Sequence, residues 1–204
     1  MVLQSAELRD SAEQLRKSAE ALQTQNAVLT KQTFEATYFQ LVALFNGVAR
    51  DMQITLTPFQ DPQNEGGTFE NRQCIQKLLE ILNGTFLNKV ARGDQNVPLS
   101  EAIDVEYSRF YEVYGHVVGH YFRTIYNVIK FVDLSLLPEQ EKKFYTNLVR
   151  AQISKPELGP LFYNCVSHYG NERFLPLVLK YRLLKHLEDG VLLDPSHRNL
   201  LDGF

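Results

Sequence analysis

The fold is decided by the stretch from Phe110 to Gly170, which reads FYEVYGHVVGHYFRTIYNVIKFVDLSLLPEQEKKFYTNLVRAQISKPELGPLFYNCVSHYG. Over residues 107–132 the apolar and aromatic side chains recur at steps of three and four, which places them on one wide face of a helix. Asp133 and Pro138 mark the expected end of this helix. The stretch therefore predicts a long helix whose apolar face other helices must cover.

The same stretch contains a break between two helices within residues 148–164. Ser154 can accept a hydrogen bond from a free amide of the second helix, and Glu157 can bond back to the Ser154 amide. Pro156 stands where no helical donor is needed. The sequence predicts a capping box at Ser154. We expect Arg150 and Glu157, on either side of this turn, to be mostly buried and bonded to each other or to nearby backbone and tyrosine groups.

Residues 4–31 are polar except for leucines spaced seven apart. The leucines are Leu8, Leu15, Leu22 and Leu29, and if they occupy the d positions of a heptad, the a positions are Ser5, Ala12, Ala19 and Asn26. Small residues and one asparagine at a can fix register and strand number. The pattern predicts a parallel homodimeric coiled coil. From Phe34 the apolar seam broadens, so one long helix should continue from the arm into a globular body.

Further helices are predicted on both sides of the central stretch. Loops rich in proline, glycine and polar residues are expected at 57–67 and 92–98, with Thr68 capping a helix over 69–86 and Ser100 capping the long central helix. A last helix is expected near 172–188, ending before Gly190. No strand periodicity is visible, so the predicted class is all-α: a coiled-coil arm at 1–33, a helical bundle domain at 34–190 and an irregular tail at 191–204.

Composition narrows the class of protein. A chain of 204 residues with 44% apolar content can bury one sizeable core. A net charge of −3 creates no field that would recruit nucleic acid or anionic lipid, so no nucleic-acid partner is expected. Cys74 and Cys165 lie in apolar helical patterns and are expected to be buried thiols in a reducing cytoplasm. No signal peptide and no apolar run of about 20 residues is present.

Two histidine patterns could carry chemistry. His116 and His120 are four residues apart on the predicted helix, a spacing that metal sites use, but no cluster elsewhere would complete the ligands, so neither a metal nor another cofactor is expected. Arg109 and His116 fit the loose Arg-x(4–6)-His pattern of HEPN-type ribonucleases, a helical class found in phage defence. About 0.8 such pairs is expected by chance in this chain, so the match carries little weight.

Three segments carry a family resemblance: HYFRTIYNVIKFVD at 120–133, YTNLVRAQISKPELGPLFYN at 145–164 and Gly170. Together they resemble the putative phage abortive infection protein family of bacteria, whose signature is similar to H-x-F-R-x-x-Y followed by R-A-Q-[LI]-S-x-x-E-L. The upstream segments FEATYFQLVALFNGVARDMQI and GGTFENRQCIQKLLEIL are also similar to that family. The polar side chains of the signature are His120, Arg123, Tyr126, Arg150, Gln152, Ser154, Glu157, Tyr163 and Asn164. They form either a pocket or partner surface, or a buried hydrogen-bond network that caps helices.

The resemblance implies a function in bacterial antiphage defence. We expect the protein to act through assembly and partner binding, with homodimers formed by the arm and a phage or host protein as partner. Family members commonly carry membrane helices ahead of the coiled coil, so the resemblance also implies a cytoplasmic part of an inner-membrane protein, anchored by a segment absent from this chain. The alternative is a HEPN-like, metal-independent ribonuclease with Arg109 and His116 in its active site.

Overall fold

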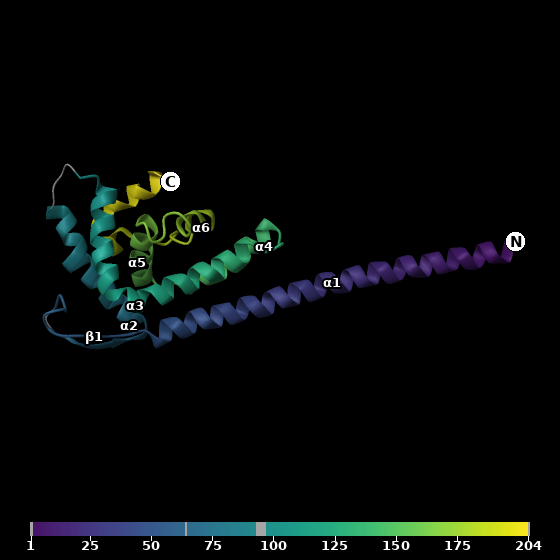
Figure 1. The fold of residues 1–204 in the computed structure, drawn as a ribbon, viewed down its shortest axis with the longest axis horizontal. Helices are drawn as coiled ribbons and strands as arrows, with labels where there is room; N and C mark the ends of the chain where they lie inside the picture. The colour runs from purple at the N-terminus through teal and green to yellow at the C-terminus, as the bar shows by residue number, and fades with distance from the viewer. Residues whose placement is uncertain (1, 64, 93–96, 204) are drawn as a thin grey trace. The chain divides into compact units, whose positions relative to one another are not determined.

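The computed structural model describes residues 2–63, 65–92 and 97–203 (Figure 1). The chain forms two compact units, Met1–Gln40 and Leu41–Phe204. Helix α1, Val2–Asp51, makes up the described part of the first unit and continues into the second. The predicted long N-terminal helix is therefore confirmed, whereas the coiled-coil pairing of this helix stays a prediction. The side chains of Ser5 and Leu8, the first heptad pair, lie outside the described part.

The second unit is built from helices, which confirms the all-α class. Its α-helices are α2 (Asn71–Ile81), α3 (Leu99–Asp133), α4 (Glu139–Arg150), α5 (Lys155–Val166) and α6 (Leu175–Lys180). A π-helical turn at Leu82–Phe86 and a 3-10 helix at Leu87–Arg92 follow α2, and 3-10 helices at Asp189–Val191 and Pro195–Gly203 follow α6. Helix α3 begins with Pro98 at the N-cap position, so Ser100 lies inside the helix and the predicted Ser100 cap is wrong.

A small hairpin precedes α2 and departs from the sequence prediction. Strands β1 (Gln53–Leu56) and β2 (Gly67–Glu70) pair antiparallel, with Gln53 opposite Glu70. Thr68, expected to cap a helix, lies in β2, and Glu70 is the N-cap residue of α2 instead. Strands of four residues are too short to show a period of two in the sequence. The predicted 57–67 loop is the connection of this hairpin, up to the first residue of β2.

Helix α5 lies at the centre of the second unit, among α2, α3 and α6 (Figure 1). Every residue from Glu157 to Ser167 is buried, and α3 buries one face that includes Phe110, Ile125 and Val132. Both cysteines are buried and unpaired, and burial raises the pKa of the Cys74 thiol to about 12. The burial of a nearly continuous apolar helix explains why its few polar side chains have defined partners.

The C-terminal part differs most from the sequence prediction. The helix expected over 172–188 extends only over Leu175–Lys180, because Arg182 adopts the left-handed conformation with φ 53°. Residues 195–203 form 3-10 turns in which His197 is buried and shares a hydrogen bond of 2.9 Å with the Tyr163 hydroxyl. Burial lowers the pKa of His197, so this ring is neutral at pH 7. The end of the chain thus packs onto α5.

Candidate functional site

The polar side chains of the signature do not form one network; the structure distributes them over separate places. The first is the confirmed capping box, where Ser154 and Glu157 bond each other's backbone amides. Glu157 is fully buried and also accepts a hydrogen bond from the Arg72 guanidinium, which donates a second bond of 2.8 Å to the Gln152 carbonyl. The Gln152 side chain accepts a bond from Asn46. This part of the signature holds α1, α2 and α5 together.

Two other members of the signature are also bonded inside the fold. The Tyr163 hydroxyl accepts a bond of 3.1 Å from the Leu193 amide besides its bond with His197. Arg150 does not contact Glu157; its Nη1 donates to the carbonyl of Arg182 at 3.4 Å. Both side chains thus bond backbone groups and not each other, and Glu157 is buried whereas Arg150 is half-buried.

Three of the four remaining members of the signature, Arg123, Tyr126 and Asn164, line one open cavity of about 360 Å³, which we call the Arg123 pocket. Its walls come from α3, the end of α5 and the turn before α6. The polar lining groups are Arg123, Asn127, Asn164 and Arg173, and the aromatic ones are Tyr111, Phe122, Tyr126, Tyr169 and Phe174. His120, also in the signature, lies outside the lining and contacts Arg123, with 3.3 Å between His120 Nδ1 and Arg123 Nη2.

A glycine on α3 shapes the aromatic wall of this pocket. A Cβ atom at Gly119 would lie 2.6 Å from the Tyr111 hydroxyl, so only glycine leaves this hydroxyl its place against the helix. Tyr111 in turn stacks on Tyr169, with 4.1 Å between ring centroids. On the opposite side, Tyr126 meets Phe174 edge-on at 5.6 Å. Such ring pairs hold each other in fixed orientations, which preorganises the wall.

The turn that carries Tyr169 is fixed at both ends. The His168 backbone and ring contact the Asp104 carboxylate at 2.8 and 3.0 Å, which ties the turn to the start of α3. A Cβ atom at Gly170 would lie 2.6 Å from the Asn164 carbonyl oxygen, so the chain can pass close to α5 only with glycine here. Asn164 donates a bond of 3.2 Å to the buried Tyr107 hydroxyl.

The chemistry of the Arg123 pocket is that of recognition. Both guanidinium groups, on Arg123 and Arg173, are exposed, and within the described chain neither pairs with a carboxylate. No carboxylate, thiol or histidine lines the cavity. Burial raises the pKa of Tyr169, so its phenol stays neutral at pH 7. Without a nucleophile beside a base, the lining can bind charged and aromatic groups but offers no general base.

The residues of the ribonuclease alternative lie elsewhere on α3. Arg109 donates to Glu106 on its own helix. His116 is exposed and lines a different cavity of about 420 Å³ together with His120. No contact joins Arg109 and His116 among the described residues, and the same residues contain no group of three potential metal ligands. The ribonuclease activity stays a prediction that RNA cleavage by the chain and its His116→Ala variant can test.

Comparison with known proteins supports the resemblance seen in the sequence. Residues 114–191 match the model of a family described as "Putative phage abortive infection protein". No curated protein and no solved structure matches the chain. The matched range includes every lining residue of the Arg123 pocket except Tyr111. No helix among the described residues has the length and apolar character needed to cross a bilayer.

Proposed function

Since residues 114–191 match the model of a family described as "Putative phage abortive infection protein", we propose that this chain acts in antiphage defence by assembling and by binding a partner at the Arg123 pocket. The main support is that Arg123 and Tyr126 on α3 and Asn164 on α5, all members of the signature, line the same open cavity. The Arg123 guanidinium is exposed, whereas Glu157 and Tyr163 are bonded inside the core. Asn164 both lines the cavity and bonds the buried Tyr107 hydroxyl.

The lining of the pocket indicates what kind of partner it accepts. A guanidinium group binds a carboxylate through two parallel hydrogen bonds, and an aromatic face accepts an apolar or aromatic side chain. Two unpaired guanidinium groups beside several aromatic rings therefore suit a protein segment with acidic and aromatic residues. We take this partner to be a phage or host protein. Arginine and tyrosine are also the residue types that contribute most at protein interfaces.

The arm is the part that we propose for assembly. Three of its heptad leucines are exposed, Leu15 by 72%, Leu22 by 59% and Leu29 by 49%. They recur along an otherwise polar helix with ion pairs such as Arg16–Glu20 at 3.0 Å on its surface. A second copy of the same helix would cover this stripe and place Asn26 against Asn26. We further propose, from the resemblance alone, a membrane anchor ahead of the arm and a location at the cytoplasmic side of the inner membrane.

Sedimentation of the purified chain tests the assembly. We expect its mass to rise toward that of a dimer as concentration increases, because small a residues make the pairing modest in strength. A Leu15→Gln/Leu22→Gln variant should stay monomeric, whereas Arg16→Gln, which removes only a surface ion pair, should dimerise like the parent. A parent that sediments as a monomer at every concentration would refute assembly through the arm.

The defence function is tested by phage plating. Bacteria that express the protein at its natural length should give at least tenfold fewer plaques with one or more phages of a broad panel than bacteria with an empty vector. In infected cultures, growth should stop before new phage is released, which is what abortive infection means. Equal plaque counts across the panel would argue against a role in defence.

A further inference from the structure

A second cavity, about 490 Å³ in volume, lies between α4 and the end of α6. Its lining includes five cationic side chains and no carboxylate, and we call it the basic pocket: Lys143, Arg150, Lys180, Arg182 and Lys185. Asn147 and the ring of Tyr181 complete the lining. Lys143, Asn147 and Arg150 recur at steps of four and three on α4, so they share one face of that helix. The whole pocket lies within residues 114–191.

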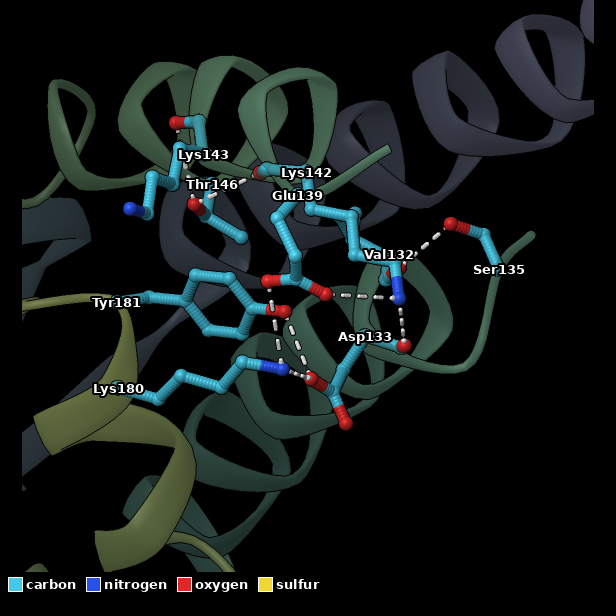
Figure 2. A network of polar contacts seen from close by, with 9 residues as sticks. All are labelled: Val132, Asp133, Ser135, Glu139, Lys142, Lys143, Thr146, Lys180 and Tyr181. Carbon is cyan, nitrogen blue, oxygen red and sulfur yellow. Dashed lines mark hydrogen bonds and ion pairs between the residues drawn. The ribbon is translucent and has the colours of Figure 1, made fainter. Parts of the chain in front are cut away.

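Among the described residues, carboxylates neutralise one of these cations, Lys180. Figure 2 shows Lys180 and Tyr181 pointing at the Asp133 carboxylate, with distances of 2.6 and 2.7 Å. Glu139 lies 3.7 Å from the same ammonium group. Burial alone would raise the pKa of Asp133, but the bonds from Lys180 and Tyr181 outweigh burial and hold it below its usual value. Asp133 is therefore ionised at pH 7 and offsets the charge of Lys180.

The other four cations have no such partner. No carboxylate within the described residues forms an ion pair with Lys143, Arg150, Arg182 or Lys185. Arg150 donates to the Arg182 carbonyl at 3.4 Å, which directs its guanidinium to the end of α6. The pocket thus gathers four uncompensated positive charges in one concave surface, an arrangement that attracts anions.

One of these charges, on Arg182, belongs to a residue whose backbone conformation is unfavourable for any residue with a side chain. Tyr181 is the C-cap of α6, and the two bonds that follow it define a Schellman motif: the Leu183 amide to the Val178 carbonyl at 3.0 Å and the Arg182 amide to the Leu179 carbonyl at 3.2 Å. Arg182 occupies the left-handed position of the motif, with φ 53°. Glycine is the usual residue there, because a side chain destabilises this conformation.

Stabilisation of helix ends does not explain why residue 182 is arginine instead of glycine. Cations near the C-termini of α4 and α6 favourably oppose the helix dipoles, and this explains Lys180 and the bond made by Arg150. A glycine at position 182 would end α6 with less strain, and Lys180 would still oppose the dipole. Strained backbone that persists with a functional side chain is a feature of binding sites.

We propose that the basic pocket binds an anion that carries two or more phosphate groups. Four unpaired cations match several negative charges, and guanidinium groups bind phosphate oxygens through paired hydrogen bonds. The volume lies in the range of small-molecule sites, about 300–1,000 Å³, and exceeds what a single phosphate ion fills. The pocket is separate from the Arg123 pocket in its lining residues, so its ligand is additional to the proposed protein partner.

Calorimetric titration at low salt tests the proposal, with inorganic tripolyphosphate and ATP as probes. Both should bind the parent chain. Equal affinities would assign recognition to the phosphates alone, and tighter binding of ATP would add the nucleoside; either result supports the site. Arg182→Gly should weaken binding about tenfold or more, while its melting temperature stays the same or rises by up to about 4 °C. Lys185→Ala should weaken binding similarly, and Arg182→Lys should retain most of it.

Asn71→Gly is the matched control. Among the described residues, Asn71 and Arg182 are the two non-glycine residues with positive φ, and φ of Asn71 is 56°. This variant relieves the same kind of backbone strain without removing a charge, so its affinity for tripolyphosphate should equal that of the parent. The proposal is overturned if neither probe binds the parent. It is equally overturned if Arg182→Gly and Lys185→Ala both bind the probes as tightly as the parent does.

Discussion

Replacing Arg72 with alanine should lower the free energy of unfolding by about 3 kcal/mol, the lower end of the range for leaving a buried charge without its partner, because the Arg72 side chain is itself 42% exposed. Glu157 has no exposed surface, and the Arg72 guanidinium is its only cationic partner among the described residues. Without it, the carboxylate keeps one bond from the Ser154 amide. The Gln152 carbonyl would lose its bond from Arg72 in the same variant.

Tyr121 shows how deeply the Glu157 carboxylate is buried. Its hydroxyl lies in the same buried region, where burial and the nearby Glu157 carboxylate raise the pKa of Tyr121 well above the usual value. Atom Oε1 of Glu157 is buried as well. A carboxylate in such surroundings is stabilised mainly by its cation and by hydrogen bonds.

Thermal unfolding measures the effect. For a chain of this size, the loss corresponds to a melting temperature lower by roughly 10 °C. Arg50→Ala is the matched control, because Arg50 pairs only with the exposed Asp51 at 3.4 Å and should contribute less than about 1 kcal/mol. The double variant Arg72→Ala/Glu157→Gln should recover part of the loss, since it removes the buried charge. An Arg72→Ala protein that melts like Arg50→Ala would contradict this assignment.

The Arg72–Glu157 pair also shows where prediction from sequence ends. The capping box at Ser154 joins residues three positions apart, so a motif of four consecutive residues is enough to predict it. The long helix α3 follows from its periodicity in the same way. Arg72 lies 85 positions from Glu157 on another helix, and no local pattern marks it as the partner. Only the packing of α2 against α5 brings the two together.

Other differences have similar physical causes. Arg182 ends α6 in a conformation that normally requires glycine, so the sequence placed the end of that helix too late, near Gly190. The sequence marked three residues that line the Arg123 pocket but left open whether they form a pocket or a buried network, and it did not mark Tyr111, Tyr169 and Arg173. Gly119 and Gly170 were the available signals for this pocket, since both permit a close approach of neighbouring atoms.

The second large effect that we expect is the loss of phage protection in the double variant Arg123→Ala/Arg173→Ala. Each guanidinium of an interface hot spot contributes about 2 kcal/mol or more, so removing both should weaken partner binding at least about a hundredfold. Both side chains are exposed and lack ion pairs within the described chain, so stability should change by no more than about 1 kcal/mol. The double variant can therefore lose partner binding without losing its folded structure.

The measurement that tests the account most directly is phage plating of this double variant alongside its melting curve, with Arg50→Ala as control. We expect the double variant to melt within a few degrees of the parent and to give as many plaques as the empty vector, while Arg50→Ala still protects. A folded double variant that protects as well as the parent would contradict the claim that the Arg123 pocket carries the defence function.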